Sequence, residues 1–272
     1  MIGIIDIFGG FGNQLFQLSF AKYLSKKNIN TFAYVDKSLF LNKSNEYYQK
    51  RNLILPTENF GLKTLTNTQL KLLETIKKNK RISKKFYEIL TEKNEIDFDN
   101  LKRINSFNGF WQNMKYVEPV LKDLLTDLKK DKRLENALLK EKNYKTMLLV
   151  RRGDFTEHGL DLDLSFYEQA LIKTDIKNGY DIFTDDVEWV KNQKLFNKSD
   201  NIFPPSDDKD KVIELFSRML NYKNFIIGNS TFSFWGALVG SNIDSKIIIS
   251  KKFAQKLNLD FSNQFSSLIE ID

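Results

Sequence analysis

Short apolar segments that stop abruptly at glycine, basic, acidic or amide residues recur along this chain of 272 residues. The first covers residues 1–7, which have the pattern of a buried strand. A glycine loop, GGFGN, follows it within two residues. Residues 13–26 then carry apolar side chains at helical spacing. A strand, a tight loop and a helix in this order predict the beginning of an α/β unit with a parallel sheet.

The same alternation of strand and helix is clearer in the second half of the chain. It predicts strands at residues 145–150, 180–184, 225–228 and 245–250, the last being the final strand, and helices at 164–174, 209–222 and 232–240. The first half is predicted to add a strand at 31–35, a helix at 68–77, a strand or loop at 107–112 and a helical stretch at 117–142. We therefore expect two Rossmann-like domains, residues 1–143 and 144–272, with a ligand-binding cleft between them.

Composition excludes several classes of chemistry. The chain has no cysteine, so disulfides, thiolate metal sites and cysteine nucleophiles are ruled out, and a reducing compartment fits. The N-terminus has no basic region before its apolar run and is interpreted as a strand, not a signal peptide. No segment approaches the roughly 18–20 apolar residues of a membrane span. A cytoplasmic protein is expected.

The chain is basic, with a formal net charge of +7 and a pI of about 9.2. Such a charge suits nucleic acid, an anionic membrane face or an anionic small substrate, or it reflects nothing more than a solvated lysine-rich surface. The lysines are interpreted as scattered rather than gathered in one arm, and no nucleic-acid-binding motif is present. Peripheral contact with an anionic membrane is therefore the preferred functional interpretation, and no nucleic-acid partner is expected.

The glycine loop GGFGNQ does not fit the dinucleotide-binding pattern G-x-G-x-x-G, because Leu15 stands where the third glycine is required. Its glycines, among them Gly10 and Gly12, allow the backbone to turn tightly or to approach a ligand. Asn13 and Gln14 are then expected to direct their amides into the cleft. The alternative is an ordinary turn from strand to helix in which Asn13 caps the helix.

Two arginines end the strand at 145–150. Successive side chains on a strand face opposite ways, so one of Arg151 and Arg152 is expected to enter the cleft while the other braces the structure. A guanidinium is well suited to clamp a pyrophosphate through paired, charged hydrogen bonds. Asp154, after the turn at Gly153, is a candidate to orient an arginine, cap a helix or act as a base. The alternative is a surface ion pair.

Two further strand ends carry candidate binding residues. Asp185 and Asp186 suit either a metal–nucleotide complex or a hydrogen bond to a purine or ribose, and we assign no metal site because no His/Asp/Glu spacing supports one. Ser230 and Thr231 open a helix, where backbone amides and hydroxyls form a phosphate site. Ordinary helix capping by serine or threonine is the alternative.

Together these segments resemble the bacterial α-1,2-fucosyltransferases of glycosyltransferase family 11. The similar segments are GGFGNQLFQ at residues 9–17, FNGFWQ at 107–112, VRRGDF at 150–155, FTDD at 183–186 and IIGNSTFSFWGA at 226–237. The resemblance spans almost the whole chain. The chain departs from the family pattern at one position: the family's usual histidine, two residues before the first arginine, is Leu149 here.

The resemblance implies a GT-B-like fold, GDP-β-L-fucose as donor, inversion at the anomeric carbon, and neither a metal nor another cofactor. It implies that Arg151 holds the β-phosphate with support from Arg152, and that Asn13 faces the reacting centre. The remaining residues that it assigns to the donor are Ser230, Thr231 and Phe232 at the phosphate and fucose, with Asp185 or Asp186 at the guanosine. Asp154 is the candidate base.

The implied acceptor is the 2-hydroxyl of a terminal galactose in an oligosaccharide. A bacterial surface polysaccharide, such as lipopolysaccharide O-antigen, assembled at the inner face of the cytoplasmic membrane would suit the basic surface. Residues 36–106 have weak patterns and are expected to shape acceptor choice. Two other interpretations stay open: a transferase of the same scaffold with another nucleotide sugar, and a non-catalytic basic binding protein.

Overall fold

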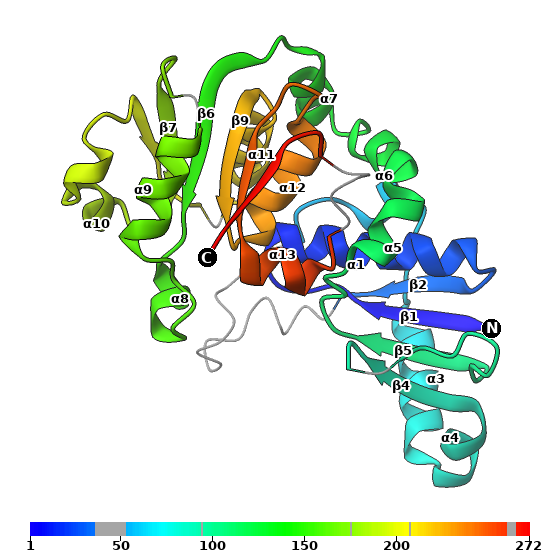
Figure 1. The fold of residues 1–272 in the computed structure, drawn as a ribbon. Coiled ribbons are helices and arrows are strands. Elements are labelled where there is room, and N and C mark those ends of the chain that lie inside the picture. Colours follow the sequence, from blue (N-terminus) through cyan, green and yellow to red (C-terminus); the bar gives the residue numbers. More distant parts are fainter. Residues whose placement is uncertain (36–52, 94, 175, 207, 260–264) are drawn as a thin grey trace. The chain divides into compact units, whose positions relative to one another are not determined.

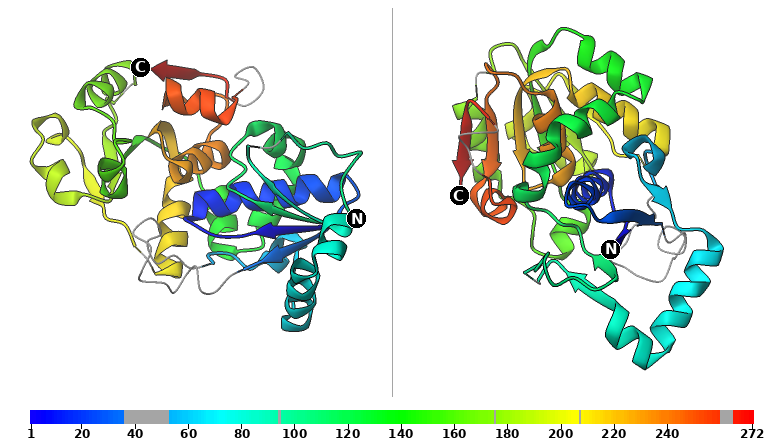
Figure 2. Two further views of the ribbon diagram at one scale, coloured as in Figure 1. Left: turned by 90° about the horizontal axis from the view of Figure 1, so that it is seen from below. Right: turned by 90° about the vertical axis from the view of Figure 1, so that its right-hand side faces the viewer.

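The chain forms two compact α/β units, Met1–Lys130 and Asp131–Asp272, in a computed structural model (Figure 1). The structure describes residues 1–272 except 36–52, 94, 175, 207 and 260–264. Each unit has its own parallel sheet with helices packed on it (Figures 1 and 2). The α/β class and the two Rossmann-like units of a GT-B-like chain are thereby confirmed.

The first unit is built on a five-stranded sheet of order β3-β2-β1-β5-β4, and all its strand pairs are parallel. Its strands are β1 (Ile2–Asp6), β2 (Asn30–Tyr34), β3 (Lys63–Thr64), β4 (Tyr87–Thr91) and β5 (Ile104–Asn108). The central position of β1 places its carboxyl end beside that of β5. The loops that follow these two strands are therefore neighbours.

Helix α1 (Phe11–Lys26) forms much of the core of this unit. It buries side chains around most of its circumference, as a helix at the centre of a core does. The ring of Phe20 stacks on that of Trp111 with 4.1 Å between centroids and contacts Phe107 edge-on at 5.5 Å. The other helical segments are η1 (Thr57–Phe60), α3 (Asn67–Lys78), α4 (Lys80–Phe86), α5 (Met114–Val117), η2 (Glu118–Val120) and α6 (Leu121–Leu128).

The second unit has a six-stranded parallel sheet of order β11-β10-β9-β6-β7-β8. Its strands are β6 (Asn143–Val150), β7 (Tyr180–Thr184), β8 (Asn201–Phe203), β9 (Tyr222–Gly228), β10 (Ile247–Ser250) and β11 (Leu268–Ile271). If β6 is numbered 1, this is the Rossmann order 3-2-1-4-5-6. All strands are parallel, but the order in which successive strands are added to the sheet reverses between β6 and β9. Ligands of such sheets bind at the carboxyl ends of the two strands that flank the reversal.

Glycines let two helices of the second unit approach closely. A Cβ atom at Gly240 in α12 would lie 2.9 Å from the Cα of Leu220, and one at Gly236 would lie 3.2 Å from the Cβ of Met219. This packing fixes the position of α12 against α11 and on β9. The helical segments are α7 (Lys132–Leu139), α8 (Gly153–Glu157), α9 (Leu164–Lys173), α10 (Val187–Lys191), η3 (Lys194–Phe196), α11 (Lys209–Met219), α12 (Thr231–Gly240) and α13 (Lys251–Leu257).

Several of the observed elements differ from the predicted ones. The helical stretch predicted at 117–142 is divided into η2, α6 and α7, and it is interrupted at residues 129–131, which form a turn between Leu128 and Lys132. The helix predicted at 209–222 ends at Met219, since Tyr222 already begins β9. The strand predicted to be the last is followed by β11, which completes the sheet.

The observed boundary between the units also lies before the predicted one at residue 143. It follows Lys130, so that α7 belongs to the second unit, where it packs against α11. An ion pair joins the same elements, with 2.7 Å between Arg133 Nη1 and Asp210 Oδ1.

Candidate functional site

Strand register brings a basic and an acidic strand end together in the second unit. Val150 of β6 pairs with Thr184 of β7, so the next residues, Arg151 and Asp185, are also neighbours. Nη1 of Arg151 lies 2.5 Å from Oδ2 of Asp185. The other terminal nitrogen of Arg151 is hydrogen-bonded to Asp154. Arg151 thus has two carboxylate partners at the carboxyl edge of the sheet, where a Rossmann fold binds its ligand.

Arg152 is held by a different set of contacts. Its Nη1 lies 3.0 Å from Oδ2 of Asp161 and its Nε lies 3.4 Å from Oδ2 of Asp186. Its guanidinium carbon stands 4.1 Å from the centre of the Trp189 ring, within the range of a cation–π contact. Its backbone nitrogen donates to Oδ1 of Asp185 at 2.7 Å. These contacts suit the bracing role expected for one of the two arginines.

The two arginines form a partly buried network and not a surface ion pair. The side chain of Arg151 is 19% exposed and that of Arg152 is 18% exposed. Sequence reasoning identified both, but it missed Asp161 and Trp189. No local pattern marks Asp161, which lies in a loop, whereas Trp189 stands three residues after the predicted pair of acids.

Two neighbours fix the backbone of this strand end. A Cβ atom at residue 153 would lie 2.6 Å from Oδ2 of Asp185, so the close packing of the carboxylate requires Gly153. Tyr167 is buried beneath the strand end and hydrogen-bonds the backbone of Arg151. Burial raises the pKa of the Tyr167 phenol, against the opposing effect of that hydrogen bond. The phenol is therefore neutral near pH 7 and serves as a support.

The two acids after β7 both face the arginines. Asp186 also caps helix α10, since its Oδ1 accepts from the backbone nitrogen of Trp189 at 3.0 Å. Asp185 and Asp186 therefore have protein partners in the structure, and a role at a guanosine stays a prediction for both. Within the residues that the structure describes, no group of three or more His, Cys, Asp or Glu side chains is arranged to hold a metal ion.

The end of β9 lies on the other side of the Rossmann reversal. The strand closes with Gly228 in a left-handed conformation, φ 59°. The side chain of Asn229 then donates to the carbonyl of Leu160 at 2.6 Å. Ser230 is the N-cap residue of α12, and its side chain makes no capping hydrogen bond. The capping alternative for this serine is therefore wrong, and a ten-residue helix begins beside the arginine strand with its amides at the sheet edge.

The aromatic residues of α12 divide into two groups. Phe234 and Trp235 are fully buried in the core. Phe232 is half-buried, and its ring centre lies 5.6 Å from that of Phe216 in α11. Its predicted contact with the donor is untested, like that of Thr231, the first residue of the helix. Leu149, in place of the family's histidine, is a buried core residue of β6.

In the first unit, an amide pair joins the first turn of α1 to the loop after β5. Gly9 adopts a left-handed conformation, φ 77°, and helix α1 begins at Phe11 with Gly10 as its N-cap residue. Asn13 is thus inside the first turn, and the alternative that it caps the helix is wrong. Its Oδ1 accepts a hydrogen bond from Nε2 of Gln112 at 2.8 Å.

Gln14 does not direct its amide toward a ligand, contrary to our expectation. Its side chain is 1% exposed. Its Nε2 donates to the carbonyl of Gly9 at 2.9 Å, and its Oε1 accepts from the backbone nitrogen of Ile54 at 3.0 Å. The physical reason is that a buried loop carries backbone groups that need partners. Gly12, also buried, is part of the same helix turn.

Gln17 makes a comparable bridge that sequence reasoning missed. Its Oε1 accepts from the backbone nitrogen of Phe8 at 3.0 Å, and its Nε2 donates to the carbonyl of Gly109 at 3.1 Å. The side chain is fully buried. A glutamine inside an apolar helical pattern was the available signal, because such a group must find buried partners.

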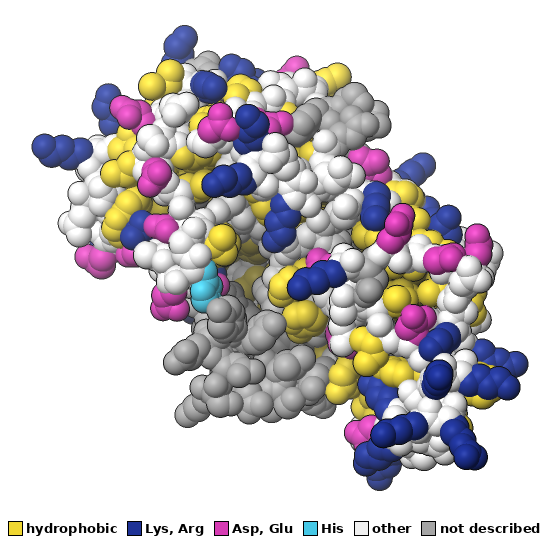
Figure 3. Space-filling model, turned by 60° about the horizontal axis from the view of Figure 1, so that its bottom comes forward, with side chains coloured by type: hydrophobic (Ala, Val, Ile, Leu, Met, Phe, Trp, Pro, Cys, Tyr) yellow, Lys and Arg dark blue, Asp and Glu magenta, His cyan; other side chains and the backbone are white. Residues whose placement is uncertain are grey.

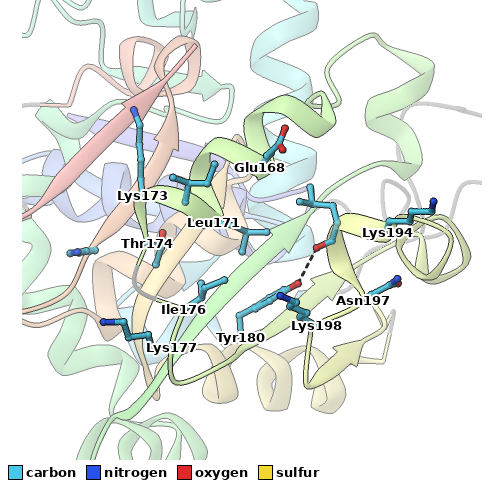
Figure 4. Close-up of a pocket in the computed structure, with 13 residues that line it drawn as sticks. Glu168, Leu171, Lys173, Thr174, Ile176, Lys177, Tyr180, Lys194, Asn197 and Lys198 are labelled. Carbon is cyan, nitrogen blue, oxygen red and sulfur yellow. Dashed lines mark hydrogen bonds between the residues drawn. The ribbon is translucent and has the colours of Figure 1, made fainter.

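A large cavity lies away from these strand ends. It has a volume of about 960 Å³ and opens between α9, the start of β7 and η3 in the second unit (Figure 4). Tyr180, whose hydroxyl donates to the carbonyl of Leu195 at 3.3 Å, lies on its wall. Tyr180 is the first residue of β7, so this cavity is at the amino edge of the sheet. The carboxyl edge with the arginines remains the candidate active site.

One family model matches almost the whole chain. The sequence model of glycosyl transferase family 11 matches residues 4–265. The chain is 25% identical over 283 residues to the O-antigen biosynthesis glycosyltransferase WbnK of Escherichia coli, covering 90% of this chain and 92% of the relative. It is also 25% identical over 279 residues to an α-1,2-colitosyltransferase of Escherichia coli, covering 92% of this chain and 91% of the relative.

Among solved structures, the chain is similar to the NodZ α-1,6-fucosyltransferase co-crystallised with GDP. The TM-score is 0.44 at 12% identity, over 88% of this chain and 92% of that one. A structure of the fucosyltransferase NodZ from Bradyrhizobium matches with a TM-score of 0.42 at 12% identity, over 88% of this chain and 92% of that one.

Proposed function

The chain belongs to glycosyl transferase family 11 and is a glycosyltransferase, and we propose that it transfers L-fucose from GDP-β-L-fucose to the 2-hydroxyl of a terminal galactose. The observation that carries the proposal is the position of Arg151, beside the start of α12 at the reversal of a Rossmann sheet. Cationic and helix-terminal groups in that position suit a nucleotide diphosphate. The O-antigen relative supports a bacterial surface polysaccharide as the destination of the sugar.

In the proposed reaction, the bond between fucose C1 and the β-phosphate oxygen breaks, and its electron pair leaves with GDP. The galactose 2-oxygen forms the new bond at C1 from the opposite face, which inverts the anomeric configuration. Arg151 and the amides of α12 stabilise the negative charge that grows on the phosphate. Since these groups are fixed parts of the protein, we propose that transfer requires no divalent metal.

Asp154 is the proposed acceptor of the proton that leaves the galactose hydroxyl. Asp154 forms an ion pair with Arg151, and this pair has to open before the carboxylate can accept a proton. A diphosphate that binds Arg151 would compete with the carboxylate for the same guanidinium nitrogen. Donor binding would then release Asp154 at the moment when a base is needed.

A second candidate function is transfer of colitose instead of fucose, since one relative of similar identity is named as a colitosyltransferase. Both reactions use the same diphosphate site and differ in the sugar pocket. We place either reaction in the cytoplasm, which suits a chain without cysteine.

The test is to incubate the purified chain with a panel of GDP- and UDP-sugars and β-galactosides in the presence of a chelator. Released nucleotide and product mass give the donor, and product linkage analysis gives the position of the new bond. A 2-linked fucoside formed with chelator present is expected. GDP binding without transfer to any galactoside would reject the acceptor, and failure to bind GDP would reject the proposal.

A further inference from the structure

The hairpin of α3 and α4 in the first unit buries little of its surface. Leu73 is the buried residue of α3, and α4 has no buried residue. Leu73 and Ile76 of α3 pack on the sheet of their own unit, while the rest of the two helices, which pack against each other, projects from it (Figures 1 and 2). Helices this short are stabilised in proteins mainly by packing of an apolar face. So exposed a pair suggests a partner outside the described chain.

This hairpin carries a dense positive charge. Six of the nine residues from Lys77 to Lys85 are lysine or arginine, and none is acidic. The interpretation that the lysines are scattered along the chain is therefore wrong for this segment. In the described part of the chain, none of these six cations forms an ion pair with a carboxylate. Basic side chains gather at the lower right of Figure 3.

The charges and the apolar side chains of α4 lie on different sides. Lys80 and Lys84 are four residues apart and form one row, with Arg81 and Lys85 in the adjacent row. Ile82 falls outside both rows and is 41% exposed. The helix is thus basic on one side and apolar on the other, which is the pattern of a helix that lies in a membrane interface.

Aliphatic side chains nearby remain uncovered as well. Leu72 of α3 is 61% exposed, and Ile89 of the edge strand β4 is 53% exposed. Nucleic acid would gain little from exposed aliphatic groups, because its binding depends on phosphate contacts and aromatic stacking. A lipid surface uses both features, since its headgroups attract the cations and its acyl boundary accepts the aliphatic side chains.

We propose that the α3–α4 hairpin docks the protein on an anionic lipid bilayer. Docking through this hairpin involves neither the arginine site nor the identity of the sugar, so it is independent of the proposed function. Its consequence is that the enzyme works at a membrane surface, where a sugar chain carried on a lipid would be within reach.

The experiment is co-sedimentation of the full chain with vesicles of phosphatidylcholine alone or with phosphatidylglycerol added. The test variant is Lys80→Glu/Arg81→Glu/Lys84→Glu. The control is Lys209→Glu/Lys252→Glu/Lys256→Glu, which makes the same change in net charge at exposed lysines of the second unit. Thermal melts of both variants check that they fold.

The wild type and the control are expected to bind anionic vesicles but not neutral ones. The hairpin variant should partition at least about tenfold less, because each basic residue near an anionic surface contributes to binding. Raising the salt concentration should weaken binding of the wild type. The double variant Leu72→Ser/Ile82→Ser keeps every charge. Its binding to anionic vesicles at high salt should be weaker than that of the wild type.

Equal loss of vesicle binding in the hairpin variant and the control would overturn the proposal, since it would show that net charge alone matters. Binding of the wild type to a random DNA duplex in preference to anionic vesicles would overturn it in favour of nucleic acid. Transfer of sugar to a soluble galactoside, measured in parallel, reports on the proposed function alone. Its failure would leave the vesicle result unchanged.

Discussion

The two units place different chemistry at equivalent positions of their sheets. In the first unit, the loops after β1 and β5 are shaped by amide side chains, Asn13 and Gln112 among them. In the second unit, two arginines and four aspartates form one network around the ends of β6 and β7. Both sets lie at the carboxyl edge of a parallel sheet, so the fold itself does not explain the difference.

The difference separates two kinds of ligand. Neutral amides donate and accept hydrogen bonds without a charge, which suits sugar hydroxyls. Guanidinium groups suit phosphate, and the carboxylates around them occupy their hydrogen-bond donors until an anion arrives. We therefore propose, as we predicted from the sequence, that the acceptor sugar binds to the first unit and the diphosphate to the second. Substitutions that separate donor binding, acceptor use and stability test this assignment.

The largest effect is expected from Arg151→Ala. Loss of a positioned donor at the departing phosphate typically slows an enzyme by about 10²–10³-fold. Initial rates of GDP release with donor and acceptor present measure it, and Arg151→Lys should recover part of the rate.

Arg133→Ala is the matched control for that substitution. Arg133 also has two carboxylate partners in the second unit, Asp131 and Asp210, but it lies on α7. It should keep nearly all the activity. Equal losses in the two variants would mean that arginine pairs of the second unit act through the fold and not through the phosphate.

Gln17→Leu should mainly affect stability. It removes the partners of two backbone groups, those of Phe8 and Gly109. A buried polar group left without a partner costs about 1–3 kcal/mol. Urea unfolding measures the change in the free energy of unfolding, and Gln69→Leu, in an exposed capping box, is the comparison. An unchanged midpoint would show that these two loops do not depend on the amide.

Asn13→Ala is expected to lower the kcat/KM for the acceptor by about tenfold, the effect of losing one or two neutral hydrogen bonds. The Kd for GDP should not change, because the phosphate site lies in the other unit in our assignment. Calorimetric titration with GDP and acceptor saturation curves measure the two quantities. A weakened Kd for GDP with unchanged acceptor kinetics would reverse the assignment.

The smallest effect is expected from Asp131→Asn. Hydrogen bonding from Arg133, the main cause, holds the pKa of the Asp131 carboxyl below its usual value. A depressed folded-state pKa stabilises the fold above the unfolded value, near 3.9, and this contribution disappears as pH falls through the folded value. The variant should therefore be less stable by under about 1 kcal/mol at pH 7. The free energies of unfolding of the wild type and the variant should differ at pH 7 and converge as the pH falls through the folded-state pKa of Asp131, which urea unfolding over a range of pH measures.

The sequence predicts the central strands of the second unit well because their apolar runs are buried. Runs such as MLLV before Arg151 allow few other interpretations. The edge strand β8 is three residues long and half-exposed, so it lacks such a run. In the first unit, β4 follows the basic hairpin directly, and only the pairing with β5 identifies it as a strand.

The candidate site could be predicted where residue type and strand position coincide, as for Arg151 and Arg152. Contacts between distant segments could not be read in this way. The role of Asp161 depends on where a loop returns to Arg152, and the placement of Gln14 depends on the backbone of Ile54. The prediction that residues 36–106 shape acceptor choice falls partly on 36–52 and 94, which lie outside the described residues.

The bridge made by Gln17 has a consequence for how the protein is produced. Its amide contacts Phe8, nine residues earlier, and Gly109, 92 residues later in the chain. During synthesis, the glycine loop and α1 leave the ribosome long before β5 exists. The Nε2 of Gln17 therefore has no partner at Gly109 until that residue is made, so these loops of the first unit reach their final form only once residue 109 has emerged. A nascent chain shorter than this would hold the family's opening motif without the loop geometry that the motif serves.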